Sequence, residues 1–403
     1  CDNGIVRLFE LSEDDGQYTL SKTMTIKDHE NARVASIAIS PTEDMAVCTT
    51  SDCQMFTLRL DNLAMMKETD NNFSSTLCSF HASAPSAAVS AGDAADNRAE
   101  KIGAAAPAEI TGMDRCSRKP LIVTCGVDRT VRVWNYQTNR AEMSKKFTDD
   151  PCSVSMHPSG LHILVGFADK LRFMNLLMDD IRIVKEFPIK GCRESQFSLG
   201  GHYFAAVNAT TINVYTTYTC ELIAVLRGHN SRVNALWWTR NDQRLMSAGK
   251  DGALYSWDVL EQKREGESVL KGCQYTAVVS DVEGNQVFSV GSDSIVKAME
   301  FQGQATNTLT NLSVDTLPGQ LAITRSARYL FAGTIGLNTN GHVIPYKMPL
   351  VGDVAPIPAL SAPITRMRVS FCDELLFVAG EDGCLMLFDV KDKDGRARST
   401  VGL

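Results

Sequence analysis

The side chains that could do chemistry in this chain of 403 residues are scattered rather than grouped. The 12 cysteines include no Cys-x-x-Cys pair, so the ligand spacing of a zinc site is absent. No His-Glu-x-x-His, Gly-x-Ser-x-Gly or Gly-x-x-x-x-Gly-Lys-Ser/Thr motif occurs. Adjacent acids such as Glu43-Asp44 lie in turn-like segments, where carboxylates are usually solvated. The sequence therefore predicts no catalytic residue, no cofactor and no metal, and indicates that the protein is not an enzyme.

One short pattern recurs along the chain. A glycine, an aspartate two residues later and an alternating segment that ends in tryptophan surround Asp251 and Trp257, and again Asp128 and Trp134. Each copy is typical of a tight turn followed by a strand. Weaker copies carry the aspartates at 169, 293 and 382, and degenerate copies fill the two long intervals. The resulting period of about 40–45 residues is that of a four-stranded propeller blade.

The most complete copy resembles the WD-repeat family, because Gly228-His229 precedes Asp251 and Trp257-Asp258. The resemblance implies a buried hydrogen-bond network of His229, Ser247, Asp251 and Trp257. The carboxylate would accept from turn N–H groups and from the histidine, and so hold two loops together. We therefore interpret His229 as structural rather than as a general base. The further turn anchors are Asp128, Trp134, Asp169, Asp293 and Asp382.

Seven full repeats can be placed in residues 63–392, which predicts an all-β, seven-bladed WD-repeat β-propeller. Residues 1–62 contain one more repeat, preceded by half a repeat. Half a repeat cannot bury its own face, so we expect residues 1–62 to be the C-terminal blades of an upstream propeller. A single eight-bladed ring that includes residues 29–60 is the alternative.

Two segments depart from the repeat. Residues 82–109 contain 12 alanines and no aromatic residue, which predicts a flexible insert in the first repeat of the propeller. Residues 393–403 are charged and aperiodic, and we expect a linker toward a coiled coil.

Composition limits the possible partners. The net charge of −7 disfavours nucleic acid, and no apolar run approaches a membrane span. Scattered cysteines in strand-like segments are typical of free thiols in a reducing compartment, so we expect a cytoplasmic location. A group of basic residues is a candidate contact with a protein partner: Arg129, Arg132, Lys145 and Lys146.

Longer stretches resemble one group of WD-repeat proteins more specifically, the cilia- and flagella-associated proteins. These stretches are residues 118–136, 157–161, 165–177, 180–182, 201–208 and 390–396. The resemblance implies tandem propellers followed by a coiled coil, with a possible coiled-coil dimer partner, in the axoneme of a motile cilium or flagellum. It also implies a scaffold that helps to place inner-arm dyneins, beside radial-spoke or regulatory-complex proteins, and contacts the doublet microtubule mostly indirectly.

A second function class remains open on the sequence alone. A generic WD-repeat adaptor of a cytosolic complex, such as a ubiquitin-ligase substrate receptor or a component of intraflagellar transport, would have the same repeats. A heptad-rich continuation would favour the axonemal scaffold. A propeller enzyme is a distant third, since a ring can gather acidic residues that lie far apart in the sequence.

Overall fold

The computed structural model describes residues 5–11, 18–25, 34–39, 45–50, 55–60, 79–80, 108–138, 140–178, 180–302, 305–313, 317–335, 340–350 and 354–391. Every regular element in these ranges is a strand, which confirms the predicted all-β class. Within the same ranges, no helical segment has the length and hydrophobicity to cross a membrane. The linker at 393–403 and the insert at 82–109, except its last two residues, lie outside the described residues.

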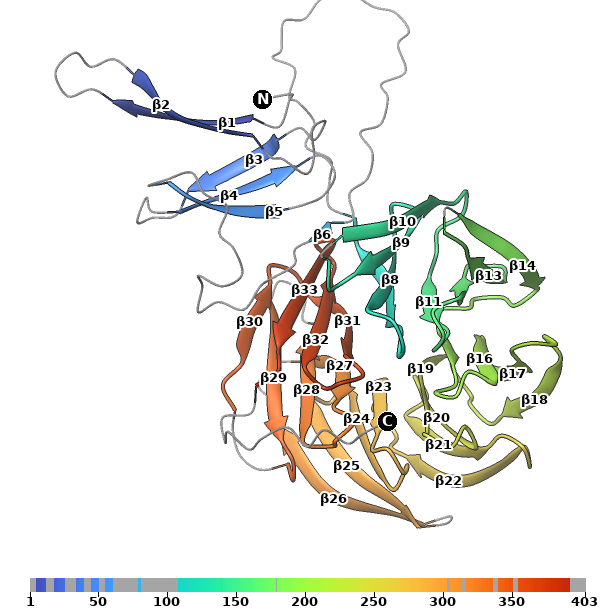
Figure 1. Ribbon diagram of the computed structural model, residues 1–403. Coiled ribbons are helices and arrows are strands. Elements are labelled where there is room, and N and C mark those ends of the chain that lie inside the picture. The colour runs from blue at the N-terminus through green and yellow to red at the C-terminus, as the bar shows by residue number, and fades with distance from the viewer. Residues whose placement is uncertain are drawn as a thin grey trace, which may run out of the picture.

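The strands from residue 79 onward form seven four-stranded antiparallel sheets, the blades of a ring (Figure 1). Blade 1 contains β7 (Ile110–Arg115), β8 (Leu121–Gly126), β9 (Thr130–Asn135) and β10 (Arg140–Lys146). Blade 2 contains β11 (Ser153–Met156), β12 (His162–Gly166), β13 (Leu171–Leu176) and β14 (Ile181–Phe187). Blade 3 contains β15 (Ser195–Phe197), β16 (Tyr203–Asn208), β17 (Thr211–Thr216) and β18 (Leu222–Arg227).

The remaining blades repeat the same order. Blade 4 contains β19 (Val233–Trp238), β20 (Arg244–Gly249), β21 (Ala253–Asp258) and β22 (Lys263–Val269). Blade 5 contains β23 (Tyr275–Ser280), β24 (Gln286–Gly291), β25 (Ile295–Gln302) and β26 (Ala305–Ser313). Blade 6 contains β27 (Pro318–Ile323), β28 (Tyr329–Thr334), β29 (Gly341–Lys347) and β30 (Ile357–Leu360). Blade 7 contains β31 (Ile364–Val369), β32 (Leu375–Gly380), β33 (Cys384–Asp389) and β6 (Ser79–Phe80).

The ring closes between its two ends in sequence. The first strand of each blade is innermost and contacts the first strand of the next blade, and β31 of blade 7 contacts β7 of blade 1. No eighth blade therefore lies between them. The outer strand of blade 7 comes from the start of the propeller, because β6 pairs with β33 through Phe80 opposite Cys384. This pairing supplies the fourth strand of blade 7 and covers the outer edge of β33.

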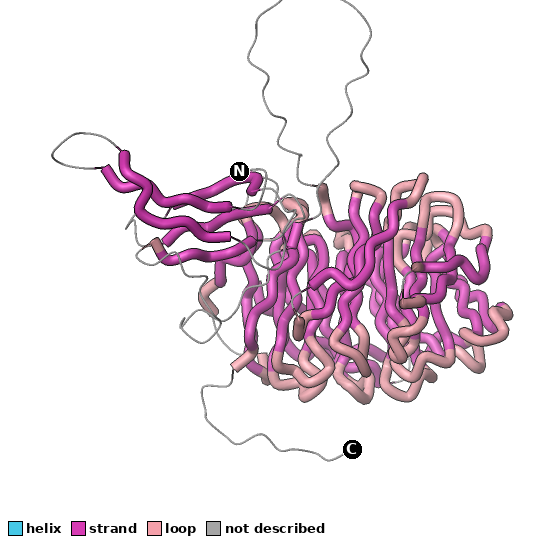
Figure 2. Tube along the Cα trace, turned by 45° about the horizontal axis from the view of Figure 1, so that its top comes forward, coloured by secondary structure: helices cyan, strands magenta, loops and turns pink. Residues whose placement is uncertain are grey.

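The residue pattern explains why these segments form blades. In β9, burial alternates along the strand, while every residue of β8 in the middle of the sheet is buried. The outer strand β10 is mostly exposed and carries lysine and arginine. Apolar clusters fill the space between neighbouring blades; one runs from Val214 of blade 3 to Trp257 of blade 4. Figure 2 shows the ring from another direction, with loops along two opposite rims.

Five further strands precede the ring in sequence and lie outside it (Figure 1). They form a pair and a three-stranded sheet: β1 (Ile5–Leu11) with β2 (Tyr18–Thr25), and β3 (Val34–Ile39), β4 (Met45–Thr50) and β5 (Met55–Arg59). Their assignment to the last blades of an upstream propeller stays a prediction.

Candidate functional site

Four residues of blade 4 come together as a chain of hydrogen bonds. His229 Nε2 lies 2.8 Å from Ser247 Oγ, and Trp257 Nε1 donates to the same oxygen at 2.9 Å. The other imidazole nitrogen, His229 Nδ1, lies 3.2 Å from both carboxylate oxygens of Asp251. Asp251 also accepts from the backbone N–H of Asn230 at 2.7 Å. The aspartate thereby joins the loop before β19 to the β20–β21 turn.

The donors in this chain are consistent with a neutral imidazole. Asp251 can only accept, so His229 Nδ1 donates to it, and Ser247 donates to His229 Nε2 while accepting from Trp257. Burial lowers the pKa of His229, although Asp251 opposes that shift. Burial acts to raise the pKa of Asp251, but its hydrogen bonds from Asn230 and His229 outweigh burial and lower it. The group is therefore suited to fixing loops rather than to transferring protons.

Blade 1 keeps half of this arrangement. Trp134 Nε1 donates to Thr124 Oγ1 at 2.8 Å, as Trp257 does to Ser247. The Asp128 side chain is 2% exposed and pairs with Arg132 at 3.1 Å, where blade 4 has a histidine. Asp128 also accepts from the backbone N–H of Thr130 at 3.0 Å. A cation four residues after the aspartate thus takes the place of the missing histidine.

Blade 5 repeats that substitution, which the sequence reasoning missed. Asp293 forms an ion pair with Lys297, also four residues later, and Lys297 is buried over the ring of Tyr275. Burial acts to lower the pKa of Lys297, but the hydrogen bond to Asp293 and the nearby Tyr275, Cys273 and Asp293 together outweigh burial and raise it. The Asp-x-x-x-Lys/Arg spacing is visible in the sequence and would have identified both pairs.

The two remaining turn aspartates differ from each other. Asp382 accepts from Ser361 Oγ at 2.9 Å and from the backbone N–H of Cys384 at 3.1 Å, so it joins two loops of blade 7. The Asp169 side chain is 70% exposed, and its nearest cation, Lys170, lies 3.7 Å away. Asp169 is therefore outside any buried network.

The four basic residues suggested as a partner contact are mostly paired within the chain. Arg129 contacts Asp150 at 2.8 Å, Lys145 contacts Asp180 at 2.8 Å, and Arg132 contacts Asp128. Lys146 is exposed on β10. The carboxylates offset most of the positive charge, so this group forms a weaker basic patch than the sequence suggested. Its contact with a partner stays a prediction.

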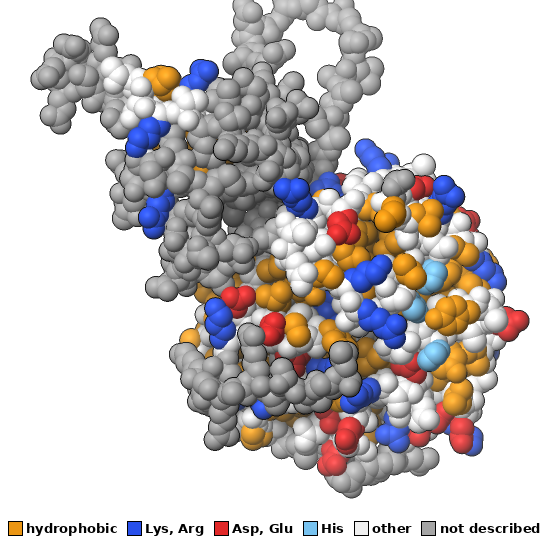
Figure 3. All heavy atoms as spheres, viewed as in Figure 1, with side chains coloured by type: hydrophobic (Ala, Val, Ile, Leu, Met, Phe, Trp, Pro, Cys, Tyr) orange, Lys and Arg blue, Asp and Glu red, His pale blue; other side chains and the backbone are white. Residues whose placement is uncertain are grey.

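A different surface has the character of a protein-binding site. The loops between the first and second strands and between the third and fourth strands of each blade share one face of the ring. On this face, blades 2 and 3 expose the large apolar residues that we call the loop-face patch: Leu161, Met178, Leu199 and Tyr218. Figure 3 shows hydrophobic and histidine side chains gathered there. Clustered exposed apolar side chains mark interaction surfaces more often than scattered ones do.

His157 holds the two loops under the loop-face patch in place. Ser159 N donates to His157 Nδ1 at 3.1 Å, so Nε2 carries the proton and donates to the Gly201 carbonyl at 3.1 Å. The His157 ring also packs edge-on against Tyr218, with 6.4 Å between ring centroids. Gly201 has φ +80°, and a Cβ there would lie 2.3 Å from His157 Nε2, so glycine is required. The exposed apolar residues are thus held on a fixed base.

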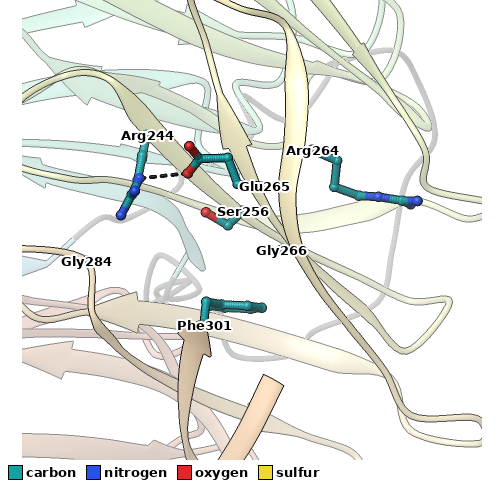
Figure 4. A pocket seen from close by; sticks show the side chains of 7 residues that line it. All are labelled: Arg244, Ser256, Arg264, Glu265, Gly266, Gly284 and Phe301. Carbon is teal, nitrogen blue, oxygen red and sulfur yellow. Dashed lines mark ion pairs between the residues drawn. The ribbon is translucent and has the colours of Figure 1, made fainter. Parts of the chain in front are cut away.

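A groove lies between blades 4 and 5 (Figure 4). It has a volume of about 320 Å³. Phe301 forms one wall, and the small residues Ser256, Gly266 and Gly284 line the rest of the cavity. Arg244 and Glu265 pair across 2.7 Å at its side. Since these charges satisfy each other, the groove offers little to orient a ligand.

No cluster of three or more histidine, cysteine, aspartate or glutamate side chains suited to a metal ion occurs in the part of the chain that the structure describes. The nine cysteines described there are free thiols. Burial raises the pKa of Cys125 and Cys192 to about 12, so neither is a ready nucleophile.

Comparison with known proteins agrees with this architecture. A family model described as "WD domain, G-beta repeat" matches residues 103–135 and 220–258, which contain the tryptophans of blades 1 and 4. These are the two blades in which an indole N–H donates to a neighbouring hydroxyl.

Three curated relatives share one name. Mouse Cilia- and flagella-associated protein 57 is 36% identical over 98% of this chain. Two proteins of Tetrahymena thermophila, Cilia- and flagella-associated protein 57 A and 57 C, are 34% and 32% identical, each over 71% of the chain. The chain spans 30%, 25% and 24% of these relatives, respectively. The chain is therefore a WD-repeat β-propeller, and over nearly its whole length it is similar to a protein named Cilia- and flagella-associated protein 57.

Proposed function

We propose that this chain is a non-enzymatic scaffold module of motile cilia or flagella. The observation that supports this most strongly is the 36% identity, over 98% of the chain, to a relative named as cilia- and flagella-associated. The coarse role, association with a cilium, follows that name. The finer role is that the protein sits in the axoneme and helps to place inner-arm dyneins on doublet microtubules, which supports beating.

The geometry supports a binding role over a catalytic one. The ring is closed by inner-strand contacts and by the β6–β33 pair, so its loops are carried on a stiff base. Tyr218, which is 73% exposed, and its neighbours in the loop-face patch present apolar area to water that a partner protein could bury. We propose that this patch docks on another axonemal protein.

Charge favours attachment through neighbouring proteins rather than directly to tubulin. The chain carries a net charge of −7, and tubulin presents an acidic surface. Like charges oppose contact within a Debye length of about 8 Å at physiological ionic strength. We therefore propose that radial-spoke, regulatory-complex or dynein components form the main contacts.

The docking proposal can be tested in the ciliated or flagellated cells that make the protein. The native gene would be replaced by a tagged form carrying Leu161→Ser and Tyr218→Ser together. We expect this form to fold but to leave the axoneme on extraction, while the unmodified tagged form remains. Val184→Ser, an exposed apolar residue on the outer strand β14, is the matched control and should behave like the unmodified form. Equal retention of all three would contradict docking through this patch.

A generic WD-repeat adaptor, as a ligase substrate receptor or a transport component, is the competing proposal. The same apolar patch would serve it equally well. Retention of the tagged protein in demembranated axonemes would favour the scaffold. Recovery of the protein only in the soluble cell fraction, with ligase or transport subunits, would favour the adaptor.

A further inference from the structure

Three arginines converge where the inner strands begin. Arg193 lies two residues before β15, Arg232 lies directly before β19, and Arg366 lies in the first half of β31. Every blade is built in the same order from its innermost strand, so all inner strands begin on the same face of the ring. These arginines therefore share one mouth of the central channel, at the opposite end of the inner strands from the loop-face patch.

One of the three is already paired. Arg366 Nη2 lies 2.9 Å from Glu194 Oε2, an ion pair that joins blade 7 to blade 3 across the channel. The two groups attract each other as charges rather than through a hydrogen bond, because Glu194 Oε2 accepts no hydrogen bond of suitable geometry. Arg366 Nε donates to the Thr111 carbonyl of blade 1 at 3.2 Å. Glu194 is thus occupied by Arg366.

Arg232 has no such partner. Its Nε is buried and makes no hydrogen bond, and no carboxylate pairs with its guanidinium in the described ranges. Burial lowers the pKa of Arg232, and its cationic neighbours Arg193 and Arg366 lower it further, while Cys152 opposes the shift. Arg193 is exposed at the same mouth and forms no ion pair with a described residue. With Glu194 included, three cations face one anion.

This arrangement is unfavourable unless something else satisfies it. A buried donor without an acceptor destabilises the folded chain, and like charges held together add to that cost. An anion would remove both penalties. The guanidinium group presents its N–H donors in a planar fork that matches two oxygens of one oxyanion.

We propose that Arg193, Arg232 and Arg366 form an oxyanion site at the channel mouth that binds an acidic segment of a partner protein. The oxyanion is a carboxylate or phosphate group carried by that segment. Arg232 forms the deep contact, exposed Arg193 attracts the segment, and Arg366 stays oriented by Glu194 and Thr111. The site lets an acidic ring hold an acidic peptide, which net charge alone would repel. It does not depend on the proposed ciliary role, nor on the loop-face patch.

The test measures binding to the full chain by fluorescence anisotropy. Two labelled probes are used: an oligoglutamate peptide, and a peptide in which one phosphoserine is flanked by uncharged residues. We expect at least one probe to bind, and Arg232→Ala and Arg193→Glu each to weaken it at least about tenfold. Arg193 is exposed, so Arg193→Glu keeps the test valid even if Arg232→Ala fails to fold. Arg227→Ala removes an exposed arginine at the end of β18 and should bind like the unmodified chain.

The outcomes separate the sources of the oxyanion. Binding of the oligoglutamate alone identifies a carboxylate-bearing partner, and binding of the phosphoserine peptide alone identifies a phosphorylated one. In either case, inorganic phosphate should compete only weakly, because it lacks the rest of the segment. Failure of both probes to bind, or equal weakening by Arg227→Ala, would overturn the proposal.

Discussion

Trp257 donates its indole N–H to the Ser247 hydroxyl at 2.9 Å, across the neighbouring strands β21 and β20. Trp134 makes the same contact with Thr124 at 2.8 Å, across β9 and β8 of blade 1. The indole and the hydroxyl therefore form a repeated lock inside a blade. What differs between blades is the partner of the turn aspartate: a histidine in blade 4, a cation in blades 1 and 5, and the Ser361 hydroxyl in blade 7.

Removal of the aspartate in blade 4 tests the part of the network that joins two loops. We predict that Asp251→Ala lowers the free energy of unfolding by about 1–3 kcal/mol, because His229 and the Asn230 N–H lose their acceptor. Urea unfolding followed by circular dichroism measures the change. Asp169→Ala, at an exposed turn aspartate, should unfold like the unmodified chain; equal losses in both variants would show that burial is not the cause.

The neutral state of His229 predicts a dependence on pH. Burial lowers its pKa in the folded chain, so the unfolded chain takes up the proton first as pH falls below the ordinary value of about 6.5. The resulting stability is complete above that pH and is lost as pH falls through the folded value. His157, whose pKa burial also lowers, contributes in the same direction. Stability curves between neutral and mildly acidic pH should therefore slope downward toward acid.

A histidine substitution isolates the contribution of His229. We expect His229→Gln to be less stable at neutral pH and to lose less stability on acidification than the unmodified chain. The remaining slope belongs to His157 and to carboxylates that lose their charge. An unchanged slope in His229→Gln would contradict a neutral, buried imidazole.

Substitution of Arg132 tests whether this residue stabilises the fold or serves as a surface contact. Its side chain is 15% exposed and pairs with the nearly buried Asp128. We predict that Arg132→Gln lowers the free energy of unfolding by about 1–3 kcal/mol, since a buried carboxylate loses its cation. Lys146→Gln on exposed β10 should change it by less than about 0.5 kcal/mol. Thermal or urea unfolding that ranks the two variants equally would favour a surface role for both.

The Glu194–Arg366 pair across the channel should stabilise the closed ring. We predict that Glu194→Gln lowers the free energy of unfolding by about 3 kcal/mol, because Arg366 is then a partly buried cation beside Arg232 without a counterion. The double variant Glu194→Gln with Arg366→Met should recover much of that loss. Additive losses in the double variant, measured by urea unfolding, would show that the two residues do not interact.

Much of the fold could be predicted because local pattern and tertiary structure agree. Each copy of the repeat carries its own turn residues and alternating strands, so the period alone gave the four-stranded blade and the all-β class. The network of His229, Ser247, Asp251 and Trp257 is implied by the resemblance to the WD-repeat family, and all four residues lie within a single blade and its preceding loop.

What escaped prediction depends on contacts between distant residues. Arg132 looked like a surface cation, because a strand position does not reveal whether its side chain turns toward a buried aspartate. The Glu194–Arg366 pair joins residues 172 apart in sequence and exists only because seven blades close into a ring. The loop-face patch likewise assembles from loops of two blades, none of them apolar enough alone to be noticed.

The measurement that tests the central proposal most directly is tomography of axonemes from cells that lack the protein, together with recordings of ciliary beating. The scaffold proposal predicts intact doublet microtubules, the loss or displacement of a subset of inner-arm dyneins, and slower beating. Re-expression of the protein should restore all of these features. Full dynein occupancy and normal beating in verified deletion cells would contradict the proposal and favour the cytosolic adaptor.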